Sequence, residues 1–434
     1  MILIFSLLGI IILGRNVLLS IKKGVYLSIV NIISVIEILD LFFPAILGSF
    51  SGKYFALPYV APLNDSEVLT AVIIADLSFI LLLFGYNRFR PTLRKENAYI
   101  ESSIDFIKVK WVFLISVGIY FLDLYYSYKS FGSWMEFYTF KLTRAYAVGV
   151  EAKSGFARII SILAETTYVI ILMMFGIMIT HKEHYSKRDF GMYITLIIVV
   201  CLLSLSRGTI IGLFISIVAC LEFKSYSVGG LSDKTKKMLY KYSVIGVCCF
   251  LLFGGMRNAL QQSHFQDEKT GVFESAIEAA NNTFGNSLIA LTRTVRYVES
   301  GKPLFEGQSY GEMFLSFVPR SIMPNKPSLY GVQNLTMANG SPESTMDAIT
   351  IPGELLMNFG YIGIIFMLLW GIAFRVVDNL RYKVRLRYFL SAAIFTISTT
   401  SCWMSFTGFF SQLKYLIIYY IVLKIVISIY PKRL

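Results

Sequence analysis

The sequence predicts an all-α, polytopic membrane protein with about eleven transmembrane helices, since a helix needs roughly 17–25 apolar residues to cross a bilayer. Composition, apolar runs and the placement of basic residues all support this class. Apolar residues make up 56% of the 434 positions, charged residues only 15%, and the mean hydropathy is +0.64. Soluble domains carry about 25% charged residues, so an ordinary soluble protein is excluded. We expect one helical membrane domain over residues 1–434.

Polar breaks divide the apolar sequence into candidate spans. The expected spans are Ile2–Leu13, Gly24–Ser49, Glu67–Tyr86, Trp111–Tyr126, Ile159–Thr180, Phe190–Ser204, Thr209–Phe223, Tyr242–Gly255, Leu355–Phe374, Tyr388–Phe406 and Leu413–Ile429. Lysine and arginine are concentrated in alternate loops, and such loops are typically cytoplasmic. This pattern places the N-terminus outside and the C-terminus in the cytoplasm. The net charge of +13 is then mainly a topology signal, and it requires no nucleic-acid partner.

One external loop, Met256–Gly353, is too long to be a simple connector. Apolar residues recur in it at helical spacing, which predicts an amphipathic helix lying on the membrane surface or on the spans. These residues are Phe273, Ile277, Ala280, Phe284, Leu288, Leu291 and Val295. A shorter helix is expected over Gln308–Phe317. Beyond it, Pro319, Pro324 and Pro327 prevent regular helix.

Several kinds of chemistry lack a sequence signal. The five cysteines all fall inside apolar runs, so we expect no disulfide framework. There are only three histidines, of which His181 and His184 lie on a basic cytoplasmic loop, and we expect no metal site. The sequence contains no glycine-rich phosphate loop, and we expect no cofactor.

The external cations are the positive signal, because positive charge is sparse on that side of a membrane. Guanidinium groups bind two phosphate oxygens at once. Neighbouring prolines restrict the backbone of Arg320 and Lys326, and Arg207 lies in a turn between two short spans. Each cation could instead be a solvated loop charge or a partner of a lipid headgroup. The set comprises Arg144, Arg207, Arg257, Arg293, Arg296, Arg320 and Lys326.

Carboxylates within spans are costly and are usually functional or paired. Glu354 follows Pro352-Gly353 and begins a span, although acidic residues also favour helix N-termini for electrostatic reasons. Glu37 and Asp40 share one face of the second span, and we expect them to be structural partners of a cation or of polar backbone. Other candidates are Asp76, Asp123 and Glu165.

A family resemblance rests on four features. These are Ser206-Arg207-Gly208 between spans, the large external loop, the string VPRSIMPNKP, and PGELLMNFGYIG leading into a span. Together they resemble the oligosaccharide repeat-unit polymerases, also called O-antigen or Wzy polymerases. The resemblance covers the topology of the whole chain and is sharp in sequence over Ser204–Gly208 and Gln308–Gly363.

The resemblance implies a GT-C-type membrane glycosyltransferase in the bacterial inner (cytoplasmic) membrane. Such enzymes join oligosaccharide units carried on undecaprenyl pyrophosphate into O-antigen or capsule-type polysaccharide. A repeat-unit flippase and a chain-length regulator would be partners. We expect Arg207, Arg320 and Lys326 to bind the pyrophosphates, with Arg144 and Arg296 as further candidates. The expected catalytic residues are Arg320 and Glu354, the latter as the base, with Asp347 as its rival. Tyr310, Tyr330 and Trp134 could stack on sugars.

Two other functions fit the same sequence. A polysaccharide ligase would share the membrane domain and the external loop but would transfer the finished chain to another acceptor. A lipid-linked oligosaccharide transporter or flippase would explain the charges within spans. The long loop argues against a transporter, because transporters commonly show internal repeats and short connections.

Overall fold

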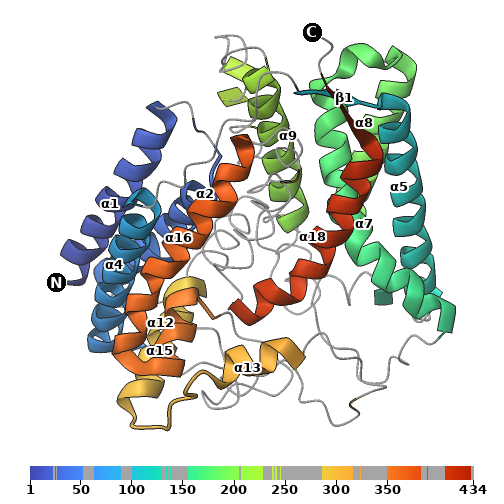
Figure 1. Cartoon of the computed structure of the whole chain (residues 1–434). Coiled ribbons are helices and arrows are strands. Elements are labelled where there is room, and N and C mark those ends of the chain that lie inside the picture. The colour runs from blue at the N-terminus through green and yellow to red at the C-terminus, as the bar shows by residue number, and fades with distance from the viewer. Residues whose placement is uncertain are drawn as a thin grey trace. The chain divides into compact units, whose positions relative to one another are not determined.

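The computed structural model is mostly helical and forms two compact units, which we treat separately (Figure 1). One unit comprises residues 1–93, 281–379 and 396–414, and the other comprises residues 94–280, 380–395 and 415–434. The structure describes residues 1–22, 25, 27–51, 63–88, 100–129, 133–134, 136–137, 155–204, 207–227, 237–238, 240–241, 245, 286–315, 323, 349–382, 389 and 406–431.

The first unit contains all the described residues of the long loop. Its elements are α1 (Ile2–Lys22), α2 (Ile29–Glu37), η1 (Ile38–Phe42), α3 (Phe43–Ser51), α4 (Asp65–Arg88), α12 (Asn286–Glu299), α13 (Gln308–Leu315), α15 (Ile351–Phe359), η3 (Gly360–Phe366) and α16 (Met367–Asp378). Helix α4 packs along both α1 and α16, and α12 contacts α4, α15 and η1. The expected amphipathic helix is therefore confirmed over α12, where Leu288, Leu291 and Val295 are buried against the spans. Helix α13 confirms the second expected helix up to Leu315.

The second unit is built around α7 (Gly155–Thr180), which packs against α5 (Phe106–Lys129) and α9 (Arg207–Ser227). It also contains η2 (Lys182–His184), α8 (Lys187–Ser204) and the part of α18 (Phe406–Val426) from Tyr415 onward. The division between units falls within α18 and within η4 (Asn379–Tyr382), which follows α16. Strands β1 (Ile100–Ile104) and β2 (Ile427–Pro431) form an antiparallel pair in which Ile100 lies opposite Pro431 and Ile104 opposite Ile427. The described residues are mostly helical, as the sequence predicts, and this short strand pair is an addition that was not expected. The pair also shortens the last expected span, since the helix stops at Val426. The segments ISIYP and IESSI are rich in isoleucine and short, as pairing strands often are.

The helices bear out the prediction of a membrane protein. Four are long and apolar enough to cross a bilayer among the residues that the structure describes: Ile2–Lys22, Ile29–Phe50, Asp65–Arg88 and Ile351–Asp378. Helices α5, α7, α8, α9 and α18 coincide with further expected spans. The expected spans Tyr242–Gly255 and Tyr388–Phe406 lie almost wholly outside the described residues. The count of eleven and the single-domain organisation stay predictions.

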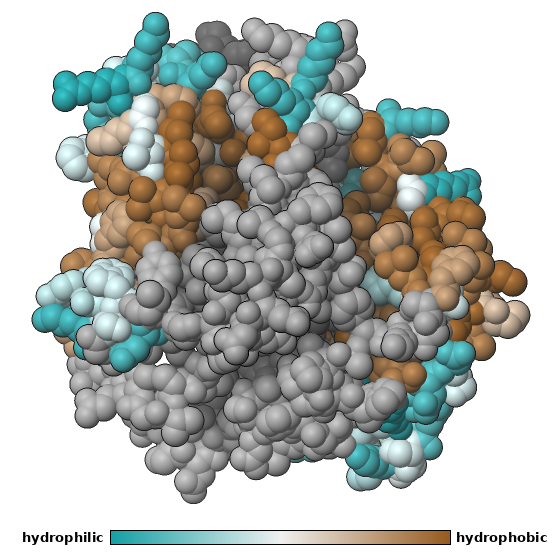
Figure 2. Space-filling model, turned by 180° about the vertical axis from the view of Figure 1, so that it is seen from behind, coloured by the Kyte–Doolittle hydropathy of each residue, from teal (hydrophilic) through white to brown (hydrophobic). Residues whose placement is uncertain are grey.

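Exposed apolar side chains recur every three or four residues along these helices. Examples are Ile4, Leu8 and Ile11 on α1, Ile107, Trp111 and Ile115 on α5, and Ile417, Ile421 and Ile425 on α18. Within each unit they form an apolar band bounded by hydrophilic residues (Figure 2). Apolar stripes of this extent are unfavourable in water, so they are the lipid-facing surfaces of membrane helices.

The second span begins and bends for identifiable reasons. At its start, Ser28 caps the helix by accepting from the Asn31 N–H, and the Asp378 carboxylate accepts from the Ile29 N–H. In the middle of the span, Pro44 has no backbone N–H and cannot continue the helical hydrogen-bond pattern. Just before it, the Phe43 N–H donates to the Ile38 carbonyl five residues earlier, which forms a wider π turn. That turn holds Asp40.

Helices α4 and α16 approach closely through two glycines. A Cβ on Gly371 would collide with the backbone carbonyl of Leu82, and a Cβ on Gly85 would collide with that of Leu368. Small residues let membrane helices bring their backbones together, which increases van der Waals contact. The glycines therefore fix the spacing of the two helices that lead to the site.

Helices α4 and α16 also run in the same direction. The Tyr86 hydroxyl near the end of α4 donates to Asp378 at the end of α16 over 2.8 Å. Glu67 and Glu354 lie in the first turns of α4 and of the α15–α16 segment, respectively. This parallel arrangement is the one that the expected topology requires of these two spans, while the absolute orientation stays a prediction.

Candidate functional site

Glu354 lies in the first turn of α15 and is 1% exposed. The helix begins there because Thr350 caps it, accepting from the Gly353 N–H, and because Pro352 suits the first turn. It ends after one and a half further turns at Gly360, whose φ of +64° favours glycine. The apolar run expected as one span is thus interrupted: α15 ends, η3 follows, and α16 continues. Glu354 is positioned on the short first piece.

A chain of hydrogen bonds orients the Glu354 carboxylate. The Ser309 hydroxyl donates to Glu354 Oε1 over 3.1 Å, and Asn358 Nδ2 donates to Ser309 Oγ over 2.8 Å. Asn358 is held in turn, because its Nδ2 also donates to the Glu354 carbonyl and its Oδ1 accepts from the Gly307 N–H. Since the Ser309 oxygen accepts from Asn358, its single proton is directed to Glu354. The network therefore orients Glu354 Oε1 as the acceptor of the Ser309 hydroxyl.

Tyr310 closes one side of this network. Its ring stacks on Phe359 with centroids 6.0 Å apart and planes 8° apart. Burial raises the pKa of the Tyr310 hydroxyl well above its usual range, and the charge of nearby Glu354 adds to this shift. Tyr310 is therefore a neutral hydroxyl beside the carboxylate. One face of its ring is occupied by Phe359, so stacking on a sugar would have to use the other.

Backbone contacts fix the loop before α13 against the end of α15. Phe305 and Glu306 donate their N–H groups to the carbonyls of Met357 and Asn358. Glu306 and Gly307 adopt positive φ angles of 49° and 86°, which turn the chain into α13. Helix α12 covers the other side, where Tyr297 packs with Met357. These contacts place Ser309 next to Glu354 although the two are 45 residues apart.

Arg296 is the one expected pyrophosphate ligand whose side chain is described. Its Nε and Nη2 donate to the two carboxylate oxygens of Glu67 over 2.8 and 2.6 Å. Glu67 also accepts from the Asn64 N–H at the start of α4. The hydrogen bonds with Glu67 raise the pKa of the Arg296 guanidinium above its usual value. A pyrophosphate would have to compete with this bidentate pair, whose geometry fits a role in tying α12 to α4.

The remaining expected ligands are not brought together by the described structure. Arg207 is the first residue of α9, and the structure describes only its backbone, in the second unit. Arg144, Arg320, Lys326 and Asp347 lie outside the described residues, as does Tyr330. Trp134 is half exposed and stacks on Tyr128. The expectation of a shared pyrophosphate pocket stays a prediction.

The carboxylates within spans divide into distinct roles. Asp40 accepts from both the N–H and the hydroxyl of Ser287, so it caps the start of α12, as expected of a structural partner. Asp378, which the sequence analysis did not single out, caps α2. Glu37 is buried within α2. Asp76 is 4% exposed, and neither of its oxygens has a hydrogen-bond partner among the described residues. An intramembrane acid of this kind is costly to ionise.

We predict that breaking the Arg296–Glu67 pair destabilises the first unit. Arg296→Gln leaves a largely buried carboxylate without its cation, at a cost of about 1–3 kcal/mol. The double variant Glu67→Gln/Arg296→Gln should recover part of this loss, since it leaves no uncompensated charge. The measurement is the thermal unfolding of detergent-solubilised protein for the two single variants and the double variant. Strictly additive effects would show that the two side chains do not interact.

No protein-family model, curated protein or solved structure matches this chain. A function is therefore inferred from the sequence motifs and from the geometry around Glu354.

Proposed function

We propose that the protein is a membrane glycosyltransferase that polymerises oligosaccharide units carried on undecaprenyl pyrophosphate, at the outer face of a bacterial inner membrane. The observation that carries the proposal is the buried carboxylate of Glu354, whose Oε1 accepts from Ser309 at the start of a candidate membrane span. The sequence resemblance to repeat-unit polymerases supports the substrate class. A GT-C-type architecture and an external N-terminus belong to the same proposal.

The chemistry requires a base and a way to stabilise a leaving anion. The acceptor hydroxyl of the incoming lipid-linked unit attacks the anomeric carbon at the reducing end of the growing chain. The new glycosidic C–O bond forms as the bond from that carbon to the carrier phosphate breaks, and undecaprenyl pyrophosphate leaves with the electron pair. The hydroxyl proton passes to Glu354. Pyrophosphate is a stable anion, so cations can assist its departure without a general acid.

Each proposed residue has one task. Glu354 accepts the proton, Ser309 and Asn358 hold its carboxylate in place, and Tyr310 limits access of water from one side. Arg320, Lys326 and Arg207 bind the pyrophosphates, with Arg144 and Arg296 as secondary candidates. A flippase would supply the lipid-linked units, and a chain-length regulator would act on the product.

The test is deletion of the gene followed by gel analysis of surface glycan. A polymerase deletion strain should keep a single transferred repeat unit and lose the ladder of longer chains, and the wild-type gene should restore the ladder. Long chains that accumulate on the carrier lipid would indicate a ligase instead. An unchanged glycan pattern would reject both enzymes. Transport of labelled carrier lipid by purified protein in vesicles, without glycosidic bond formation, would identify a flippase.

A further inference from the structure

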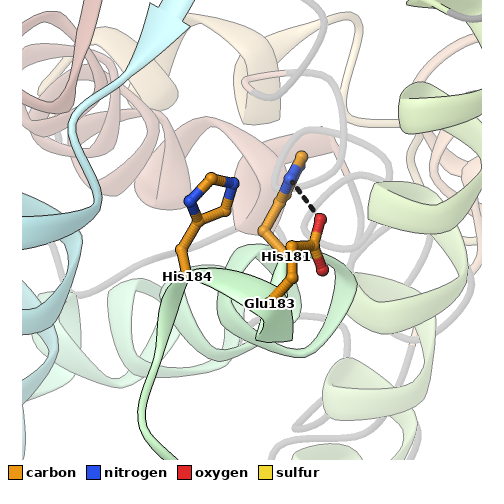
Figure 3. A group of neighbouring side chains, drawn as sticks. All are labelled: His181, Glu183 and His184. Atoms are coloured by element: carbon orange, nitrogen blue, oxygen red, sulfur yellow. Dashed lines mark ion pairs between the residues drawn. The ribbon is translucent and has the colours of Figure 1, made fainter.

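The turn between α7 and α8 gathers three side chains that commonly bind metal ions. His181, Glu183 and His184 each offer one donor atom, and these atoms all lie within 4.8 Å of one another. Both imidazoles and the carboxylate project from the same side of the turn (Figure 3). The sequence contains only three histidines, which predicts no metal site. The turn nevertheless brings two of them together with Glu183.

The backbone explains this grouping. Helix α7 ends with Thr180, and the His181 N–H makes the last helical bond, to Ile177. The chain then tightens into η2, with the His184 N–H donating to His181 and the Tyr185 N–H donating to Lys182. A 3₁₀ turn has three residues per turn, so residues 181 and 184 lie one above the other. Ser186 then caps α8 by accepting from the Asp189 N–H.

The first residue of α5 fixes the orientation of the imidazoles. The His184 ring stacks on Phe106 with centroids 3.9 Å apart and planes 12° apart, and the His181 ring lies 5.3 Å from the same side chain. Tyr185 packs edge-on against Phe106 from the same turn. His181 Nδ1 and Glu183 Oε1 are already 3.8 Å apart. Pre-oriented ligands lose less side-chain entropy when an ion binds.

We propose that His181, Glu183 and His184 form a binding site for a divalent transition-metal ion such as Zn²⁺ or Co²⁺, with water completing the coordination. Imidazole and carboxylate donors suit these ions better than Mg²⁺ or Ca²⁺. At Zn–N and Zn–O bond lengths near 2.1 Å, tetrahedral ligand atoms are about 3.4 Å apart. The Glu183 side chain is 52% exposed and can close this small difference.

Charged residues near the site should affect its affinity for a divalent cation. Lys182 lies in the turn itself, and Lys187 and Arg188 follow it closely in sequence, so the segment that holds the site is rich in positive charge. Asp189 is paired with Lys110 at 3.7 Å and contributes little to offset this charge. The Glu183 carboxylate supplies the only negative charge among the three ligands. Loss of that charge should therefore weaken binding strongly.

A bound ion would link the α7–α8 turn to α5 through the Phe106 stack. Any ligand that binds only the folded protein stabilises it by mass action, by about 2.7 kcal/mol at 100 times its dissociation constant. We therefore expect Zn²⁺ to stabilise the second unit. This proposal is independent of the polymerase activity.

The test uses full-length protein, purified in detergent on a histidine-free tag and stripped of metal. Co²⁺ is added while its visible d–d absorption is followed, and Zn²⁺ is then added as a competitor. Wild-type protein should bind one Co²⁺ per chain, and Zn²⁺ should displace it. Glu183→Gln, an exposed change that should not affect folding, should weaken Co²⁺ binding at least tenfold. The double variant His181→Gln/His184→Gln should lose the signal.

His264 provides the matched control, because it is the third of the three histidines in the chain. His264→Gln should keep wild-type stoichiometry and affinity. Absence of saturable Co²⁺ binding to the wild type would overturn the proposal. So would binding that survives both Glu183→Gln and the double histidine variant.

Discussion

Replacing Glu354 by glutamine should lower the rate of polymerisation by about 10²–10⁴-fold, the usual contribution of a general base, while the protein stays folded in the membrane. Glutamine has the same shape, and its Oε1 can still accept from the Ser309 hydroxyl, which lies 3.1 Å from the carboxylate. Only the ability to take a proton is lost. The measurement is the length distribution of surface glycan, together with turnover of a lipid-linked oligosaccharide by purified protein.

Two further variants separate a base from a structural carboxylate. Glu299→Gln changes an exposed glutamate at the end of α12, in the same unit, and should leave the ladder unchanged. Ser309→Ala removes the donor that orients Glu354 and should cause a smaller loss than Glu354→Gln. Near-normal polymerisation by Glu354→Gln would remove Glu354 as the base and leave it a buried helix-start residue.

Gly371→Leu should destabilise the first unit severely. The new side chain would meet the Leu82 carbonyl and would also bring its Cβ within 2.8 Å of the Tyr86 nitrogen. Both are backbone atoms, so no rotamer change relieves the collision and the helices must separate. Overpacking typically costs about 1–3 kcal/mol, and backbone collisions belong at the upper end. The measurement is the temperature at which the size-exclusion peak of the detergent-solubilised protein is lost.

Gly14→Leu is the matched control for this prediction. A Cβ at Gly14 on α1 would meet no heavy atom within 4 Å, so the added side chain points into open space. Leucine also favours helix over glycine by roughly 0.5–1 kcal/mol. The control should therefore melt at or above the wild-type temperature. Equal melting temperatures for Gly371→Leu and Gly14→Leu would show that α4 and α16 do not pack through Gly371.

Local sequence pattern predicts helix positions well in this chain, because a membrane helix needs only a long apolar run. The pattern does not predict the break in the helix after Phe359, because the segment around Gly360 and Gly363 is as apolar as a continuous membrane helix. It also fails for β2, because the apolar run continues past Val426. The partner strand at Ile100–Ile104 lies more than 300 residues earlier, where no local signal reveals it.

The sequence predicts only those parts of the candidate site that have a local sequence signal. Glu354 could be singled out because a carboxylate at the start of a span is visible in the sequence. Asn358 could also have been found, since its i+4 spacing places it on the same helical face. Ser309 and the Glu67 partner of Arg296 could not, because those contacts join segments 45 and 229 residues apart. Contacts between distant segments depend on the packed fold.

The β1–β2 pair sets an order on biosynthesis. Strand β1 leaves the ribosome before α5, but its partner ends at Pro431. The strands can join only after α16 of the other unit has been translated, because the two units alternate along the chain. Helix α5 and the helices that follow it must therefore be made before β1 can pair, and β1 stays without its partner strand until Ile427–Pro431 has been translated.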